Sequence, residues 1–115
     1  MRPAAAYKRL NKLLWLGRLP APTIIFVDNA TIPRMHGVTL HDGDMFVKPV
    51  IVLNRSTPWG PTLVHEMLHV AEPTLKHGIL FDKIVRRYWF TAKKRIKGIQ
   101  KSRAVVKPTE APHVA

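Results

Sequence analysis

The segment from Pro61 to Ala71 constrains the fold more than any other part of the chain, because an apolar helical pattern there contains the sequence His-Glu-Met-Leu-His. The pattern predicts a short helix of about 11 residues, roughly 16 Å long at the helical rise. This helix is expected to end before Pro73, since proline disfavours helical geometry in the residue that precedes it. Its apolar positions are Leu63, Val64, Met67, Leu68 and Val70.

The two histidines of this helix, His65 and His69, are spaced for binding one metal ion. Residues four apart lie on one helix face with Cβ atoms roughly 5 to 6 Å apart, so both imidazoles can reach a zinc ion at about 2.0 to 2.1 Å. Glu66 lies one residue further round, where a carboxylate can take a proton from a water that zinc makes more acidic. One helical turn is therefore predicted to supply two zinc ligands and a general base.

Two simpler explanations of this motif are available. With six histidines and three glutamates in the chain, roughly one shuffled sequence in a hundred contains the pattern by chance. The histidines could also be core residues without a metal, but two imidazoles beside a carboxylate in one turn are costly to bury without a partner. Metal binding is therefore the favoured interpretation.

A catalytic zinc site needs a third protein ligand and an open position, and the sequence offers two candidates for that ligand. Glu72 shares the helix face of His65, but on a straight helix it lies a full turn beyond the metal. His77 follows the connector Pro73–Lys76, which can reverse the chain and return an imidazole to the first two ligands. Gly78 permits a tight turn into the next helix. His77 is therefore predicted as the third ligand, with Glu72 as the alternative.

The rest of the chain predicts two further helices and a small sheet, so the expected fold class is α+β. Apolar residues at helical spacing predict the helices, and β-branched runs predict the strands. The Asp42-Gly43 pair is typical of a two-residue hairpin turn between Met35–Leu40 and Met45–Val47. The expected sheet is mixed and has three or four short strands. The other predicted elements are helices at Ala4–Leu16 and Ile79–Lys97 and strands at Thr23–Val27 and Val50–Leu53.

Length and composition limit the organisation and the chemistry. A chain of 115 residues is expected to form one domain, since two cores would each have too little apolar surface. The prediction is a domain over residues 1–98 and a basic tail over residues 99–115. Because the chain has no cysteine, disulfides, a zinc ribbon and a thiolate nucleophile are excluded. No apolar run approaches the roughly 20 residues of a membrane span, so a soluble, cytoplasmic monomer is expected.

Several segments together resemble the SprT-like zinc metallopeptidases, a family that includes the Spartan proteases. The similarity begins with that family's first helix and the turn after it, and continues with the strand before the active helix. It ends with the H-E-x-x-H helix and a later H-G-x-x-F element, and it covers roughly Tyr7 to Tyr88. The similar segments are Leu10–Leu14, Gly17–Pro20, Ile51–Asn54, Thr62–His69 and His77–Phe81.

This resemblance implies a minimal zincin-like domain with one zinc per chain, held by His65, His69 and His77, and with Glu66 as the catalytic base. It also implies protein substrates that are bound or crosslinked to DNA. The stretch between His69 and His77 is shorter than in the longer family members and resembles compact versions from phage genomes, for which the location would be the host cytoplasm. The C-terminal zinc ribbon of many relatives is excluded by the missing cysteines.

The positive charge suggests a second kind of partner. A net charge of +12 attracts nucleic acid, acidic proteins or anionic membranes. The densest positive region runs from the last predicted helix into the tail, with Asp82 as its one acid. Contacts with DNA phosphates are one interpretation of this region, and a solvated helix face is the other. Its basic residues are Lys83, Arg86, Arg87, Lys93, Lys94, Arg95, Lys97, Lys101 and Arg103.

A few other residues invite a functional interpretation. His36, His41, Asp42 and Asp44 could form a second metal site, but a hairpin turn explains the two aspartates without one. His36 could instead face the cleft and form a hydrogen bond with a substrate. The aromatic residues predicted to pack in the fold rather than to contact substrate are Trp59, Tyr88 and Trp89.

The sequence as a whole predicts a zinc-dependent peptidase whose peptide substrate could add to the exposed edge of the sheet. A rival hypothesis is a basic nucleic-acid-binding or structural protein that holds zinc with little or no catalysis. Glu66 discriminates between the two, because only the peptidase needs a base beside the metal.

Overall fold

The computed structural model describes residues 1–32, 34–41 and 47–99, and this part of the chain forms three helices and a three-stranded sheet. The predicted α+β class with a small mixed sheet is confirmed, and the predicted helix ends are within two residues of the observed ones. The helices are α1 (Pro3–Trp15), α2 (Gly60–Ala71) and α3 (Ile79–Arg95), and the strands are β1 (Thr23–Val27), β2 (Gly37–Leu40) and β3 (Val50–Asn54).

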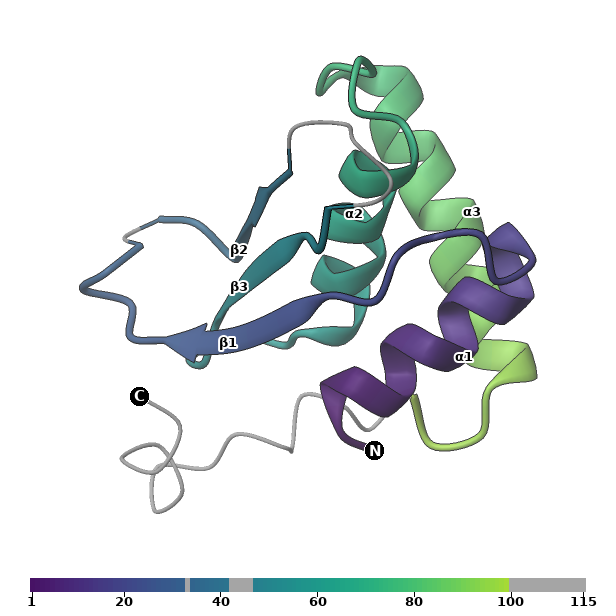
Figure 1. The fold of residues 1–115 in the computed structure, drawn as a ribbon, viewed down its shortest axis with the longest axis horizontal. Coiled ribbons are helices and arrows are strands. Elements are labelled where there is room, and N and C mark those ends of the chain that lie inside the picture. The colour runs from purple at the N-terminus through teal and green to yellow at the C-terminus, as the bar shows by residue number, and fades with distance from the viewer. Residues whose placement is uncertain (33, 42–46, 100–115) are drawn as a thin grey trace.

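The sheet has β3 at its centre, with β1 parallel to it on one side and β2 antiparallel to it on the other. Val52 of β3 lies opposite Ile25 of β1 and Val38 of β2, which fixes the register of both pairs. β2 is therefore an edge strand of this sheet, and it packs against α2 (Figure 1).

The predicted hairpin around Asp42-Gly43 falls on residues 42–46, which lie outside the described residues. Its first arm forms β2, and the strand that the structure pairs with β2 is β3. Val47, the end of the predicted second arm, lies in a bend. The long-range partner of β2 is thus a strand that follows Pro49, and local turn chemistry did not predict this pairing.

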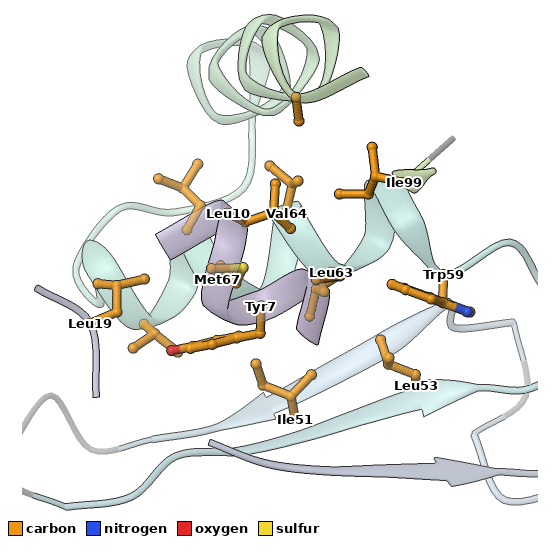
Figure 2. Packing of buried hydrophobic residues seen from close by; sticks show 14 of the residues in the cluster. Tyr7, Leu10, Leu19, Ile51, Leu53, Trp59, Leu63, Val64, Met67 and Ile99 are labelled. Atoms are coloured by element: carbon orange, nitrogen blue, oxygen red, sulfur yellow. The ribbon is translucent and has the colours of Figure 1, made fainter. Parts of the chain in front are cut away.

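The core lies between the sheet and the two helices α1 and α2. Figure 2 shows Ile51 and Leu53 of β3 pointing from the sheet towards the helices, where Leu63 and Met67 of α2 meet them, and all four side chains are fully buried. Each such side chain contributes about 1.5–3 kcal/mol by leaving water. The helix α3 packs on the far side of α1 and α2, so the molecule has three layers (Figures 1 and 2).

Hydrogen bonds from two α1 side chains fix the path from α1 into β1. The amide of Asn11 donates to the carbonyl oxygen of Leu19 and accepts from its N–H, both at 3.0 Å. The buried Tyr7 hydroxyl donates to the carbonyl oxygen of Pro20 at 2.7 Å. Leu16 and Gly17 have positive φ angles of 56° and 76°, which end the helix in the left-handed conformation. This segment therefore brings β1 alongside the core.

Aromatic packing joins α3 to the other helices, as the sequence predicts. Trp59 is 1% exposed, and Tyr88 packs edge-on against Trp15 with ring centroids 5.3 Å apart. The Trp89 ring lies so close to Gly60 that a Cβ there would be 2.5 Å from it, so α2 and α3 can approach closely only because residue 60 is glycine. These contacts hold α3 where its first turn meets the end of α2.

The folded core extends to the end of the described chain. Ile99, predicted as the first residue of the tail, is fully buried, and residues 100–115 lie outside the described part. None of the helices in the described part is both long enough and apolar enough to span a membrane.

Candidate metal centre

Three imidazole rings meet between α2 and the start of α3. The Nε2 atom of His69 lies 2.8 Å from that of His77 and 3.3 Å from that of His65, and the Nε2 atoms of His65 and His77 are 3.2 Å apart. His65 and His69 lie on successive turns of α2, and His77 lies in the connector that follows it. The three histidines are therefore close enough to bind one metal ion.

These nitrogen atoms are close enough for hydrogen bonds among the rings, but their donor and acceptor roles fit a metal ion better. In a tetrahedral site with zinc–nitrogen distances of about 2.0–2.1 Å, neighbouring nitrogen atoms are about 3.3 Å apart. A neutral imidazole nitrogen either donates or accepts a hydrogen bond, so among three mutually close nitrogens two must have the same role and repel each other. One cation that accepts all three lone pairs removes this conflict.

The backbone at Gly78 allows His77 to join the other two histidines. Gly78 has φ 157° and ψ −168°, a backbone conformation that residues other than glycine rarely adopt. It stands directly before α3, so the chain reverses there and His77 faces the end of α2. The alternative ligand, Glu72, is exposed at the C-terminal end of α2 and lies outside the histidine group. Of the two candidates, only His77 is brought to the site.

Phe81 forms an apolar wall behind the three rings. It lies in the first turns of α3 and is fully buried. Its ring centroid is 4.7 Å from that of His65, 4.6 Å from that of His69 and 5.2 Å from that of His77. Contact with one side of all three imidazoles limits how far they can rotate, so the nitrogens are held in place before any ion binds.

Burial keeps two of the imidazoles in the neutral form that binds metal. The pKa of His69 is lowered to about 4, mainly by desolvation and also by the neighbouring His65 and His77. Desolvation also lowers the pKa of His65, and His77 adds to this effect while Asp82 opposes it. Both rings are therefore unprotonated at neutral pH, with a lone pair available for a metal.

Glu66 lies beside this cluster, and one of its carboxylate oxygens accepts a hydrogen bond from β2. The residue is 3% exposed, and its Oε1 accepts a 2.7 Å hydrogen bond from the hydroxyl of Thr39 on β2. The same hydroxyl lies 3.2 Å from the backbone carbonyl oxygen of Glu66. The other oxygen, Oε2, is 4.0 Å from Nε2 of His65. The carboxylate thus has one occupied oxygen and one that faces the histidines.

The surroundings of Glu66 determine its pKa and leave space for its second carboxylate oxygen. Burial raises the pKa of Glu66 to about 7, although the hydrogen bond from Thr39 acts in the opposite direction. A carboxyl group with this pKa can exchange a proton near neutral pH. Two residues before Thr39, Gly37 leaves space for the second oxygen, because a Cβ there would be 3.2 Å from Oε2 and 2.9 Å from Thr62.

An open cleft runs past His65 and Glu66 between β2 and α2. It consists of two cavities that share Met35, Gly37, His65 and Glu66 in their walls. Gly37 and Thr39 of β2 line the cleft, so the edge strand of the sheet runs along the site. His65 and Glu66 therefore face a space that a ligand can enter.

The second metal site considered from the sequence consists of His36, His41, Asp42 and Asp44. His36 lines one cavity of the cleft and His41 lines the other, whereas Asp42 and Asp44 lie outside the described residues. Within the described ranges, the histidine cluster at residues 65, 69 and 77 is the one group of three or more potential metal ligands. His36 is an exposed residue of the cleft, where it lowers the pKa of His65 by its own positive form.

The predicted nucleic-acid residues spread over more than one surface. The basic residues of α3 and Lys97 are all exposed, and Lys101 and Arg103 lie outside the described residues. Lys83, Arg86 and Arg87 surround one cavity together with apolar residues of α3. Arg95 instead lies with Arg9 and Lys12 of α1 around another. The structure therefore adds two basic residues of α1 that the sequence did not connect to this region.

Sequence reasoning missed the residues that position the site from a distance. Thr39 and Gly37 lie on a strand whose alternation places both towards α2, but their contact with Glu66 depends on long-range packing. Asn54 is buried, and its side-chain amide donates to the Met35 carbonyl oxygen and to Oδ1 of Asn29, each at 3.0 Å. The sequence signal that could have indicated the role of Asn54 is a polar residue directly after an apolar strand, because a polar side chain that is buried there needs hydrogen-bond partners.

Comparison of the chain with protein-family models, curated proteins and solved structures finds no significant match.

Proposed function

We propose that this chain is a zinc-dependent peptidase of the zincin type, related to the SprT-like family, with zinc held by His65, His69 and His77 and Glu66 as general base. The observation that carries the proposal is a buried carboxylate with one free oxygen 4.0 Å from the nearest of three convergent imidazole nitrogens. A purely structural site needs no such base, because it needs ligands alone.

The donor set supports zinc as the ion. Three imidazoles and no thiolate suit zinc, copper, iron or nickel among the common metals. Three protein ligands on one side and a cleft on the other match the catalytic type of zinc site, which keeps a position open for water or substrate. When bound in such a site, zinc lowers the pKa of a water to near neutrality and polarises a carbonyl group.

Residues of the chain supply the proton transfers. Oε2 of Glu66 faces the histidines, so it accepts the proton of the attacking water and later delivers it to the leaving amine of the peptide. Thr39 occupies Oε1 and thereby keeps Oε2 turned towards the reaction. Burial, which raises the pKa of Glu66, favours this role as a proton carrier.

The edge strand β2 offers a way to hold the substrate. Its outer edge lies along the cleft, so an extended peptide can pair with it by strand addition and pass Glu66. Because such pairing uses backbone groups, it accepts many sequences, as expected for a peptidase that acts on varied proteins.

A second candidate function is DNA binding with little catalysis, and the exposed basic residues favour it. Arg9, Lys12 and Arg95 surround a cavity of about 390 Å³ at the junction of α1 and α3. A phosphate group near three cations would be held largely without regard to sequence. As a partner of the peptidase, DNA would bring DNA-bound substrates to the cleft.

Zinc analysis and an activity assay test the proposal together. We expect purified protein to carry about one zinc per chain and to cleave an unfolded protein such as casein. A chelator should stop the cleavage and added zinc should restore it. Protein that holds much less than one zinc and gains none on addition would contradict both zinc hypotheses. Protein with full zinc and no cleavage of free or DNA-bound substrates would favour the binding protein.

Replacing Thr39 with valine tests how Glu66 is held. Loss of a hydrogen bond to a carboxylate is expected to lower kcat about tenfold or more, with KM and zinc content little changed. Steady-state kinetics on one peptide substrate measures this, and Thr39→Ser should restore most of the rate. Thr23→Val, at an exposed position of β1, is the matched control. Equal kcat values for Thr39→Val and the wild type would show that Thr39 does not position the base.

A further inference from the structure

We infer that the cavity between Met35 and Val85 is a subsite for one large aliphatic or aromatic side chain of the peptide substrate, next to the bond that is cleaved. The inference rests on the proposed peptidase function and goes beyond it, because it names a substrate preference and a residue that sets it. The cavity lies on the side of Glu66 where the N-terminal end of α2 faces α3.

The size and the walls of this cavity suit an apolar side chain. Its volume is about 460 Å³, within the range of roughly 300–1,000 Å³ that is usual for ligand pockets. Two of its walls are prolines, whose fixed backbone angles make them rigid. His65 and Glu66 also line it, so a side chain inside it belongs to a residue close to the reacting bond. The apolar walls are Met35, Pro58, Pro61 and Val85.

The cavity on the other side of the site differs in chemistry. Its volume is about 310 Å³, and its walls include the polar residues Thr39, His41, His69 and His77. The two cavities share Glu66, so a peptide that runs along the cleft places one neighbour of the cleaved bond in each of them. The apolar preference is therefore expected on one side of the bond only.

Charged side chains fit the apolar cavity poorly. Among the described residues that line it, Glu66 is the one acidic or basic residue apart from the histidines. An acidic side chain would have to leave water among apolar walls. A basic side chain would have to leave water and could pair only with Glu66, the group that the proposed reaction needs free. Aliphatic and aromatic side chains meet neither obstacle.

Val85 is the residue through which the preference can be changed. It comes from α3, on the opposite side of the cavity from α2, and it is half-buried. Its neighbour Ile84 is also a half-buried aliphatic residue of α3, but it lines a different cavity on the outer face of the helix. Val85→Phe therefore narrows the subsite, and Ile84→Phe adds the same ring elsewhere.

The kinetic experiment uses zinc-loaded protein and peptides that differ at one residue on either side of the cleaved bond. For the wild type, kcat/KM with leucine or phenylalanine at one of these positions should exceed that with glycine or aspartate by at least about tenfold. Val85→Phe should reduce the ratio of kcat/KM for the phenylalanine peptide to that for the alanine peptide by about tenfold, and Ile84→Phe should keep the wild-type ratio. Cleavage with no apolar preference at either position would overturn the subsite and leave the peptidase intact.

A binding experiment gives a readout that does not depend on activity. In methyl NMR spectra, N-acetyl-leucine amide should shift the methyl signals of Val85 and Met35, whereas N-acetyl-glycine amide should not. The Val85→Phe variant should lose the shift of Met35. Shifts without any peptide cleavage would support the subsite and contradict the peptidase. Unchanged Val85 and Met35 signals with the leucine compound would overturn the subsite.

Discussion

The substitution Glu66→Gln is expected to lower the rate of peptide hydrolysis by roughly 10²–10⁴-fold, the usual contribution of a general base. Glutamine has nearly the same shape as glutamate, so its amide oxygen can still accept the hydrogen bond that Thr39 donates. It cannot accept a proton from water, however, and the reaction loses its base. Cleavage rates with zinc-loaded protein and zinc content by mass spectrometry measure the two quantities.

A matched control separates this effect from a general loss of charge. Glu72→Gln removes a carboxylate at the exposed C-terminal end of the same helix and should keep the wild-type rate. Zinc content near one per chain in both variants would show that the metal site is intact. A Glu66→Gln protein as active as the wild type would remove Glu66 from the mechanism.

The substitution His77→Ala is expected to weaken zinc binding by more than about 100-fold. Loss of a residue that only supports a metal ligand costs 10–100-fold in affinity, and loss of a direct ligand costs more. Only His65 and His69 would remain, and their Nε2 atoms are 3.3 Å apart on one helix. Competition with a coloured chelator measures the affinity, and thermal unfolding of the zinc-free proteins shows whether the fold persists.

Two control variants make this result decisive. Glu72→Ala tests the alternative third ligand and should keep the wild-type affinity. Lys76→Ala changes an exposed residue of the same connector and should also have no effect. Loss of zinc in Glu72→Ala but not in His77→Ala would reverse the ligand assignment.

Local patterns were sufficient to predict the elements and the centre of the site. The spacing of Leu63, Val64 and Met67 predicts both the helix and its buried face, and the positions of His65 and His69 follow from the same periodicity. His77 could be chosen over Glu72 because the connector contains Pro73 and the turn ends in Gly78. These features act over fewer than about 15 residues, so they can be recognised without knowledge of the fold.

Features that depend on the pairing of distant segments could not be predicted in the same way. The hydrogen bond between Thr39 and Glu66 joins residues 27 positions apart and requires the register of β2 against β3. The end of α3 shows the same limit. The helical pattern continues to Lys97, but α3 ends at Arg95, and Ile96 and Ile99 are buried in the core.

The division of α2 into two faces indicates how far the fold would depend on a bound ion. Leu63, Val64 and Met67 hold the helix in the core, and the histidines lie on another face. His69 and His77 are eight residues apart, so an ion that links them closes only a short loop and restricts the unfolded chain little. The apolar core, rather than the ion, is expected to maintain the fold. Under the proposed function, the site should release and take up zinc while the protein stays folded, so metal supply would control activity reversibly.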